Sequence, residues 1–176
     1  MKFFLVGFMG SGKSTVGKMV ADKLGWDFVD TDKMVEAQCG KSIVSVYGTD
    51  GEAVFRKLER DALLHIKVHT NNAIIATGGG MPIFSDNMSL MNTMGITIYL
   101  KCTPELLFER LKDNTVLRPL IAGDEDLNKM INCLLSKREP SYKLSTHIVK
   151  IDNSDTPDSV CEKICKLFEK RCPDKK

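Results

Sequence analysis

A glycine-rich stretch near the start of the chain has the residue types and spacing of a phosphate-binding loop. Residues 7–15 read GFMGSGKST and match the pattern G-x-x-x-x-G-K-[S/T] without a mismatch. The glycines allow the backbone to turn so that several N–H groups point at one centre. Lys13 would then reach the β- and γ-phosphates of a nucleotide, and the Ser14 hydroxyl would bind Mg²⁺.

The residues on either side of this loop predict the strand and the helix that it requires. Residues 3–7 form a short apolar run suited to a buried strand, and apolar residues recur at helical spacing over 13–24. Gly25 then ends the helix. A helix that starts at the loop adds partial positive charge for an anion. A glycine-rich turn without a ligand is the alternative, and the strand–loop–helix order disfavours it.

Two carboxylates follow the second predicted strand, residues 26–32, where a helix takes over. Ligands of open α/β sheets bind at this end of the strands. Because Asp30 and Asp32 are two residues apart on an extended segment, they are expected to point to opposite faces and to do different jobs. One could hold a metal through water, and the other could accept a hydrogen bond from a substrate hydroxyl. Alternatively, Asp32 only caps the helix and Asp30 is a turn residue.

Two later segments could approach the same ligands. Arg56 and Glu59 lie three apart on a predicted helix over 52–68, so they can interact, although a solvated charged face would look the same. The apolar run 73–77 reads as a buried parallel strand. It leads directly into the glycines 78–80, which would leave backbone exposed for close approach by a ligand or would form a flexible turn.

The remaining candidates are arginines in the second half of the chain. Residues 112–125 are polar and irregular, contain Arg118, and have the length of a lid over an active site or of a plain surface loop. Arg138 follows on a further predicted helix. Guanidinium groups bind carboxylate or phosphate bidentately. With Asp32 beside Arg56 and Arg138, a small hydroxylated carboxylic acid would fit.

Alternation of strands and helices predicts the architecture. Further strands are expected over 96–100 and 147–151, which gives five parallel strands with helices on both faces, a three-layer α/β/α fold. Neither repeats nor a linker divide the chain, so one domain is expected over 1–176, with its core at about 3–171. The other predicted helices cover residues 33–38, 42–47, 85–94, 104–112, 126–138 and 157–170.

Composition limits the partners and the compartment. The net charge of +2 gives no field that favours nucleic acid or a membrane, and no segment approaches the ~20 apolar residues of a membrane span. The six cysteines form no C-x-x-C pair, so zinc and thioredoxin interpretations are weak, although Cys161 and Cys165 could share a helix face. Reduced thiols and a nucleotide loop favour the cytoplasm. A monomer without nucleic-acid or membrane partners is expected.

Several short motifs follow one another along the chain. They are residues 7–17, Asp30-Thr31-Asp32, Phe55-Arg56-x-x-Glu59, Gly78-Gly79-Gly80, Arg118-Pro119-Leu120 and Arg138-x-Pro140-x-Tyr142. Taken together and in this order, they resemble the shikimate kinase family, and the similarity spans residues 3 to about 157. The resemblance implies a P-loop fold of the nucleoside-monophosphate kinase type. It also implies Mg²⁺- and ATP-dependent phosphorylation of the shikimate 3-hydroxyl on the route to chorismate and aromatic amino acids.

The same resemblance implies roles for individual residues. Asp32 would hold the shikimate hydroxyls within a substrate-binding region at about 32–60, and Arg118 would reach over the phosphates. Arg110 would stack on adenine. Residues 154–156 precede Pro157 where the family often has a basic residue, which is a departure. The implied sets are catalytic Lys13, Asp32 and Arg118; ATP-binding Gly10, Ser11, Gly12, Lys13, Ser14, Thr15, Arg110 and Arg118; substrate-binding Asp32, Arg56, Gly79 and Arg138; and metal-binding Ser14 and Asp30.

Two other functions use the same phosphate loop. A gluconate-type or other small-metabolite kinase would share the fold but take another acceptor, and a nucleotide-binding module would lack transfer chemistry. A guanine-nucleotide switch would need N-K-x-D. Residues 128–131 read NKMI and lack the final Asp, which argues against a switch.

Overall fold

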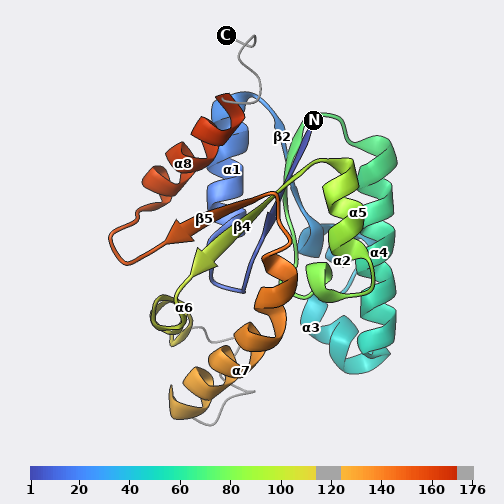
Figure 1. Ribbon diagram of the computed structural model, residues 1–176. Helices are drawn as coiled ribbons and strands as arrows, with labels where there is room; N and C mark the ends of the chain where they lie inside the picture. Colours follow the sequence, from blue (N-terminus) through green and yellow to red (C-terminus); the bar gives the residue numbers. More distant parts are fainter. Residues whose placement is uncertain (114–123, 170–176) are drawn as a thin grey trace.

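A computed structural model describes residues 1–113 and 124–169, and in this part of the chain five strands form one parallel sheet (Figure 1). The strand order is β2-β3-β1-β4-β5, and every neighbouring pair is parallel. The predicted five-stranded parallel sheet is therefore confirmed. The strands are β1 (Lys2–Val6), β2 (Asp27–Asp30), β3 (Ala73–Ala76), β4 (Ile96–Cys102) and β5 (His147–Ile151).

Helices cover both faces of the sheet, because alternate residues of its central strands point to opposite sides. Phe3 and Leu5 of β1 pack against α1 and α8 in one buried cluster. Phe4 and Val6 pack with residues of α4 and α5 in a second cluster on the other face (Figure 1). This confirms the three-layer arrangement. The helices are α1 (Lys13–Leu24), α2 (Thr31–Cys39), α3 (Ile43–Ser45), α4 (Glu52–His69), α5 (Asn87–Met94), α6 (Pro104–Leu111), α7 (Asp124–Tyr142) and α8 (Pro157–Glu169).

Two boundaries differ from the predicted ones in ways that affect the site. Helix α2 begins at Thr31, so Asp32 lies on a helix and not on the extended strand end. The cause is a cap: Asp30 Oδ1 accepts hydrogen bonds from the backbone N–H groups of Asp32 and Lys33, at 3.0 and 3.3 Å. The final helix turn of α7 extends past Pro140 to Tyr142, beyond the expected end at residue 138.

Short irregular elements connect the helices at the carboxyl end of the strands. A π-helical turn, η1 (Val46–Asp50), leads from α3 to α4, and a 3₁₀ turn, η2 (Met81–Ile83), follows the glycines after β3. Figure 1 shows α6 and α7 gathered at this same end of the sheet. The loops after β1, β2 and β3 therefore open onto one edge, as expected for parallel strands.

The structure bears on the expectations about membrane spans and about the cysteines. Across residues 1–113 and 124–169, every helix is too short or too polar to span a lipid bilayer. The five cysteines in these ranges are free thiols. Cys161 and Cys165 are both buried on α8, so they share a helix face as predicted.

Candidate active site

The loop between β1 and α1 encloses the ammonium group of Lys13. Lys13 Nζ donates to the carbonyl oxygens of Gly7 and Phe8, at 2.9 and 2.8 Å. Gly10 and Gly12 adopt φ values of 76° and 94°, which favour glycine and let the loop curl around the side chain. The lysine thus lies inside its own loop, and its contact with phosphates stays a prediction.

Burial changes the titration of this lysine. Loss of hydration lowers the pKa of Lys13 from 10.5 to about 8, although the nearby charges of Asp32 and Asp30 act in the opposite direction. Its ammonium remains charged at neutral pH, and the cation is only partly neutralised by the carbonyl oxygens around it. A polyanion at the loop would supply the missing counter-charge.

Asp30 has two tasks at the start of α2. One carboxylate oxygen caps the helix, and the other, Oδ2, accepts a hydrogen bond from Ser14 Oγ at 2.7 Å. The N-cap of α2 is therefore Asp30. The alternative interpretation, in which Asp32 caps the helix, is wrong. A hydroxyl and a carboxylate in contact provide the hard oxygen ligands that Mg²⁺ prefers.

A pocket of about 700 Å³ joins the phosphate loop to the ends of β2 and β3. Asp30 and Asp32 both line it, so the expectation that they face opposite ways is wrong, because Asp32 is carried back towards the pocket by the first turn of α2. Its other lining residues are Met9, Gly10, Ser11, Gly12, Lys13, Ser14, Thr15, Val16, Thr77, Gly79, Arg110, Ile151, Pro157 and Val160.

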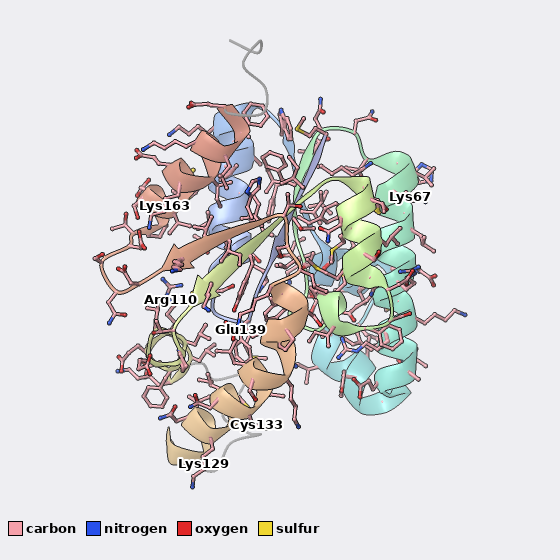
Figure 2. All side chains as sticks on the ribbon, in the orientation of Figure 1. Lys67, Arg110, Lys129, Cys133, Glu139 and Lys163 are labelled. Carbon is pink, nitrogen blue, oxygen red and sulfur yellow. The ribbon has the colours of Figure 1, made fainter. Side chains whose placement is uncertain are left out.

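Arg110 of α6 borders this pocket beside the loop. Its Nη1 donates to the Gly10 carbonyl oxygen at 3.2 Å. Figure 2 shows the Arg110 side chain between α6 and the ends of β4 and β5. Pro157 and Val160, at the start of α8, line the same pocket. These groups form a part of the pocket wall beyond the phosphate loop.

The loop that precedes Pro157 has no basic residue of its own. Asp155 in this loop instead accepts hydrogen bonds from Ser159 Oγ at 2.8 Å and from Lys163 Nζ at 2.5 Å. A lysine of α8 therefore holds the loop through Asp155.

Asp32 lies against the backbone of the glycine turn. A β-carbon built on Gly78 would lie 2.6 Å from Asp32 Oδ1 and 2.9 Å from Glu59 Oε1, so both carboxylates pack directly on this residue. Burial, followed by the charge of Asp30, raises the pKa of Asp32 above its usual value. Asp32 is thus a better proton acceptor than a solvated aspartate.

Arg56 is held by two carboxylates of its own helix. Its Nη1 donates to Glu59 Oε2 at 2.6 Å, and its Nη2 donates to Glu52 Oε1 at 3.1 Å. Only 1% of the Glu59 side chain is exposed. The three-residue spacing predicted the contact between Arg56 and Glu59, but the sequence did not identify Glu59 as part of the site. The guanidinium group lies over Gly80, where a β-carbon would collide with it.

Arg138 reaches the glycine turn from α7. A β-carbon on Gly79 would lie 3.5 Å from Arg138 Nη1 and 3.6 Å from the backbone nitrogen of Met9. The Arg138 guanidinium carbon is 5.5 Å from the centre of the Phe8 ring, which is a cation–π contact. No pattern in the sequence indicates this contact of Phe8.

The glycine turn therefore joins two groups of residues. Asp32, Arg56 and Arg138 approach it from α2, α4 and α7, and the phosphate loop adjoins it through Gly7 and Met9. Arg118 and most of the predicted lid, residues 114–123, lie outside the described residues.

A phosphate-binding loop at the end of the central strand of a parallel sheet, with a carboxylate and two arginines beside it, defines a P-loop kinase. Comparison with known proteins specifies the family. The sequence model described as shikimate kinase matches residues 9–169. The chain belongs to the shikimate kinase family.

Individual shikimate kinases are similar to this chain over nearly its full length. A shikimate kinase of Azobacteroides pseudotrichonymphae is 39% identical over 93% of this chain and 99% of its own. The crystal structure of shikimate kinase from Bacteroides thetaiotaomicron has a TM-score of 0.88 and 37% identity, covering 96% of this chain and 98% of that one. A shikimate kinase from Acinetobacter baumannii, solved in complex with shikimate, has a TM-score of 0.86 and 30% identity, covering 97% and 93%.

Proposed function

We propose that this chain transfers the γ-phosphoryl group of ATP to the 3-hydroxyl of shikimate, giving shikimate 3-phosphate and ADP on the route to chorismate and aromatic amino acids. The observation that carries the proposal is the glycine turn. Asp32, Arg56 and Arg138 all lie against it, and its Gly79 also adjoins Gly7 and Met9 of the phosphate loop that holds Lys13. A small anionic polyol bound at this turn would lie next to the end of a nucleotide triphosphate chain.

The acceptor side has the groups that such a substrate needs. The guanidinium groups of Arg56 and Arg138 would hold the shikimate carboxylate, and the Gly79 N–H would add a neutral donor. Asp32 would accept a hydrogen bond from the hydroxyl that is phosphorylated. Because burial raises its pKa, Asp32 can also take the proton of that hydroxyl as the bond to phosphorus forms.

On the donor side, the backbone N–H groups of residues 10–15 and the Lys13 ammonium would hold the triphosphate. Ser14 and Asp30 would hold Mg²⁺, which neutralises phosphate charge when bound. Among the described residues no three His, Cys, Asp or Glu side chains gather as metal ligands. A site with one carboxylate and one hydroxyl suits Mg²⁺, which keeps several waters and phosphate oxygens as ligands.

Two assignments rest on the family resemblance. Arg110 would stack on adenine, with Pro157 on the other side of the base. Arg118 would neutralise charge on the transferring group, within a lid at about 112–125. By analogy with arginine fingers, Arg118→Ala would lower turnover by ~10³-fold or more. Near-normal turnover of that variant would remove Arg118 from this role.

The wider setting follows from the same chemistry. We infer a monomeric enzyme of one domain over residues 1–176, with its substrate-binding region at about 32–60. Free thiols at the five described cysteines and the proposed use of ATP favour the cytoplasm. ATP and shikimate are the proposed partners, without nucleic acid or membrane.

A substrate panel tests the proposed function. The purified chain, ATP and Mg²⁺ would be incubated with shikimate, with gluconate, or with a shikimate analogue that lacks the 3-hydroxyl, and products would be identified by ³¹P NMR. The proposal requires a phosphate monoester at the 3-position of shikimate and no product from the other two compounds. Phosphorylation of gluconate in preference to shikimate would instead indicate a gluconate-type kinase.

A further inference from the structure

Tyr142 connects the last turn of α7 to the glycine turn. Its side chain is fully buried, and its hydroxyl donates to the Gly79 carbonyl oxygen at 2.6 Å, across 63 residues of sequence. Burial raises the pKa of Tyr142 to about 12, although the nearby positive charge of Arg138 acts against this. The phenol therefore keeps its proton and remains a donor throughout the neutral range.

The bond to Gly79 fixes one particular peptide group. The Gly79 carbonyl and the Gly80 N–H belong to the same planar trans peptide, so they point in opposite directions. Within the described part of the chain, the turn's other bonds use Gly78 N–H with Thr31, Gly78 O with Met81 and Gly80 O with Ile83. The N–H groups of Gly79 and Gly80 donate to no protein group in that part of the chain. Tyr142 thus orients a turn that has two N–H donors available.

The end of α7 that carries Tyr142 is itself anchored to the sheet. The Tyr142 ring packs on the ring of Tyr99 in β4, with centroids 5.1 Å apart. Glu139 pairs with Lys101 of the same strand at 2.6 Å. Figure 2 shows Glu139 at the sheet end of α7, whereas Lys129 and Cys133 lie on the part that extends away from the sheet.

Arg138 lies one helical turn before Tyr142, on this anchored end. Its Nη1 lies 3.5 Å from a β-carbon position on Gly79, the residue whose carbonyl Tyr142 binds. One phenol hydroxyl therefore sets the distance between the guanidinium group on α7 and the N–H donors of the turn. Both would contact the same substrate.

We propose that Tyr142 is a positioning residue for the acceptor substrate, acting by holding the glycine turn and Arg138 in fixed register. This inference rests on the proposed function, because it assigns both groups to the shikimate carboxylate side. Tyr142 does not touch the reacting atoms. Its loss should weaken binding of the acceptor more than it slows phosphoryl transfer.

Tyr142→Phe removes the hydroxyl and keeps the buried ring. We expect the KM for shikimate to rise by about tenfold, the scale of one lost buried hydrogen bond, while the KM for ATP stays the same and kcat falls by less than the KM rises. A merely structural role would reduce the amount of folded enzyme, which lowers the maximal rate and leaves the shikimate KM unchanged. Tyr99→Phe is the matched control, because it removes a hydroxyl from the adjoining ring and keeps the bond to Gly79.

A double variant tests whether Tyr142 acts through the Arg138 register. If it does, Tyr142→Phe should raise the shikimate KM much less in an Arg138→Lys background than in the wild type. Equal effects in both backgrounds, or an unchanged shikimate KM in the single variant, would overturn the inference. If the wild type does not phosphorylate shikimate, the proposed function fails instead. Shikimate binding measured by calorimetry in the presence of ADP would then still report any change caused by Tyr142→Phe.

Discussion

The two halves of the candidate site are built in different ways. The phosphate half is contiguous: residues 7–15 supply the loop, the lysine and the helix start, and Lys13 is held by carbonyls of its own loop. The acceptor half is assembled from α2, α4, α7 and the turn after β3. A local motif can keep its geometry when distant residues change, whereas the acceptor half depends on the relative placement of three helices.

The halves also differ in how they balance charge. In the phosphate half, a buried cation faces neutral carbonyl oxygens and would meet its counter-charge in the nucleotide. In the acceptor half, Arg56 already has its counter-charge in Glu59. Substitutions in the phosphate half should therefore affect nucleotide binding and turnover. Substitutions in the acceptor half should affect both the affinity for the acceptor and the stability of the fold.

The largest effect is expected in the phosphate half. Lys13→Ala should lower kcat by about 10³-fold or more, because it removes a preorganised positive charge from the transferring phosphate. Shikimate binding, measured by calorimetry, should change less than turnover, since the described hydrogen bonds of Lys13 all go to its own loop. A turnover within tenfold of wild type would show that this half does not stabilise the transition state.

Next come the two arginines of the acceptor half. Arg56→Ala and Arg138→Ala should each weaken shikimate binding by about 2–5 kcal/mol, since each removes a charged partner of the carboxylate. Steady-state kinetics would measure this as an increased shikimate KM at an unchanged ATP KM. Unchanged shikimate KM values in both variants would refute the carboxylate assignment.

The same two variants should differ in thermal stability, with Arg56→Ala the less stable. Arg56→Ala leaves Glu59, 1% exposed, without its partner, which costs about 3–5 kcal/mol. For a chain of this size that corresponds to a melting temperature lower by roughly 6–20 °C. Arg138 stacks on Phe8 and has no such buried carboxylate among its described contacts, so Arg138→Ala should melt within a few degrees of wild type. Equal melting temperatures would contradict the buried pair.

An intermediate effect is expected at the turn between the halves. Gly80 has φ −90° and ψ −21°, which any residue can adopt, but an added β-carbon would collide with the Arg56 guanidinium group. Gly80→Ala should therefore raise the shikimate KM by about tenfold or more by displacing Arg56. Gly48→Ala is the control, because a β-carbon there meets nothing within 4 Å. A similar shikimate KM in both variants would show that the turn tolerates displacement of Arg56.

The smallest effect is a pH dependence of the phosphate half. Since the pKa of Lys13 is lowered to about 8, its ammonium is charged below pH 8 and loses its charge as the pH rises through that value. ATP affinity should thus fall above pH 8, by at most about tenfold per pH unit. Calorimetry from pH 6.5 to 9.5 would measure it, with Lys13→Arg as a variant that stays charged. A constant wild-type affinity would contradict a lowered pKa.

What the sequence could predict follows the same division. The phosphate loop, five strands and most helices were predicted from local pattern alone, because each depends on neighbouring residues. Asp32 was expected to point away from Asp30, but both residues line the same pocket. The reason is that the Asp30 cap starts α2 at Thr31, two residues earlier than expected. Spacing along one helix predicted the contact of Arg56 with Glu59.

Contacts between distant segments were not predictable in this way. The stacking of Arg138 on Phe8 and the bond from Tyr142 to Gly79 join residues more than 60 positions apart. Their side chains show no local pattern that distinguishes them from ordinary core residues. The family resemblance placed Arg138 at the acceptor site, but only the folded chain shows which residues hold it there.

Phosphoryl transfer requires the two halves of the site to bind their ligands side by side. A coupled assay of ADP release, with ATP and Mg²⁺ and with increasing shikimate, measures whether they do. We predict that the rate is close to background without shikimate and rises to saturation as shikimate is added. A rate of ADP release that is the same at every shikimate concentration would show that the two ligands do not react with each other in this site.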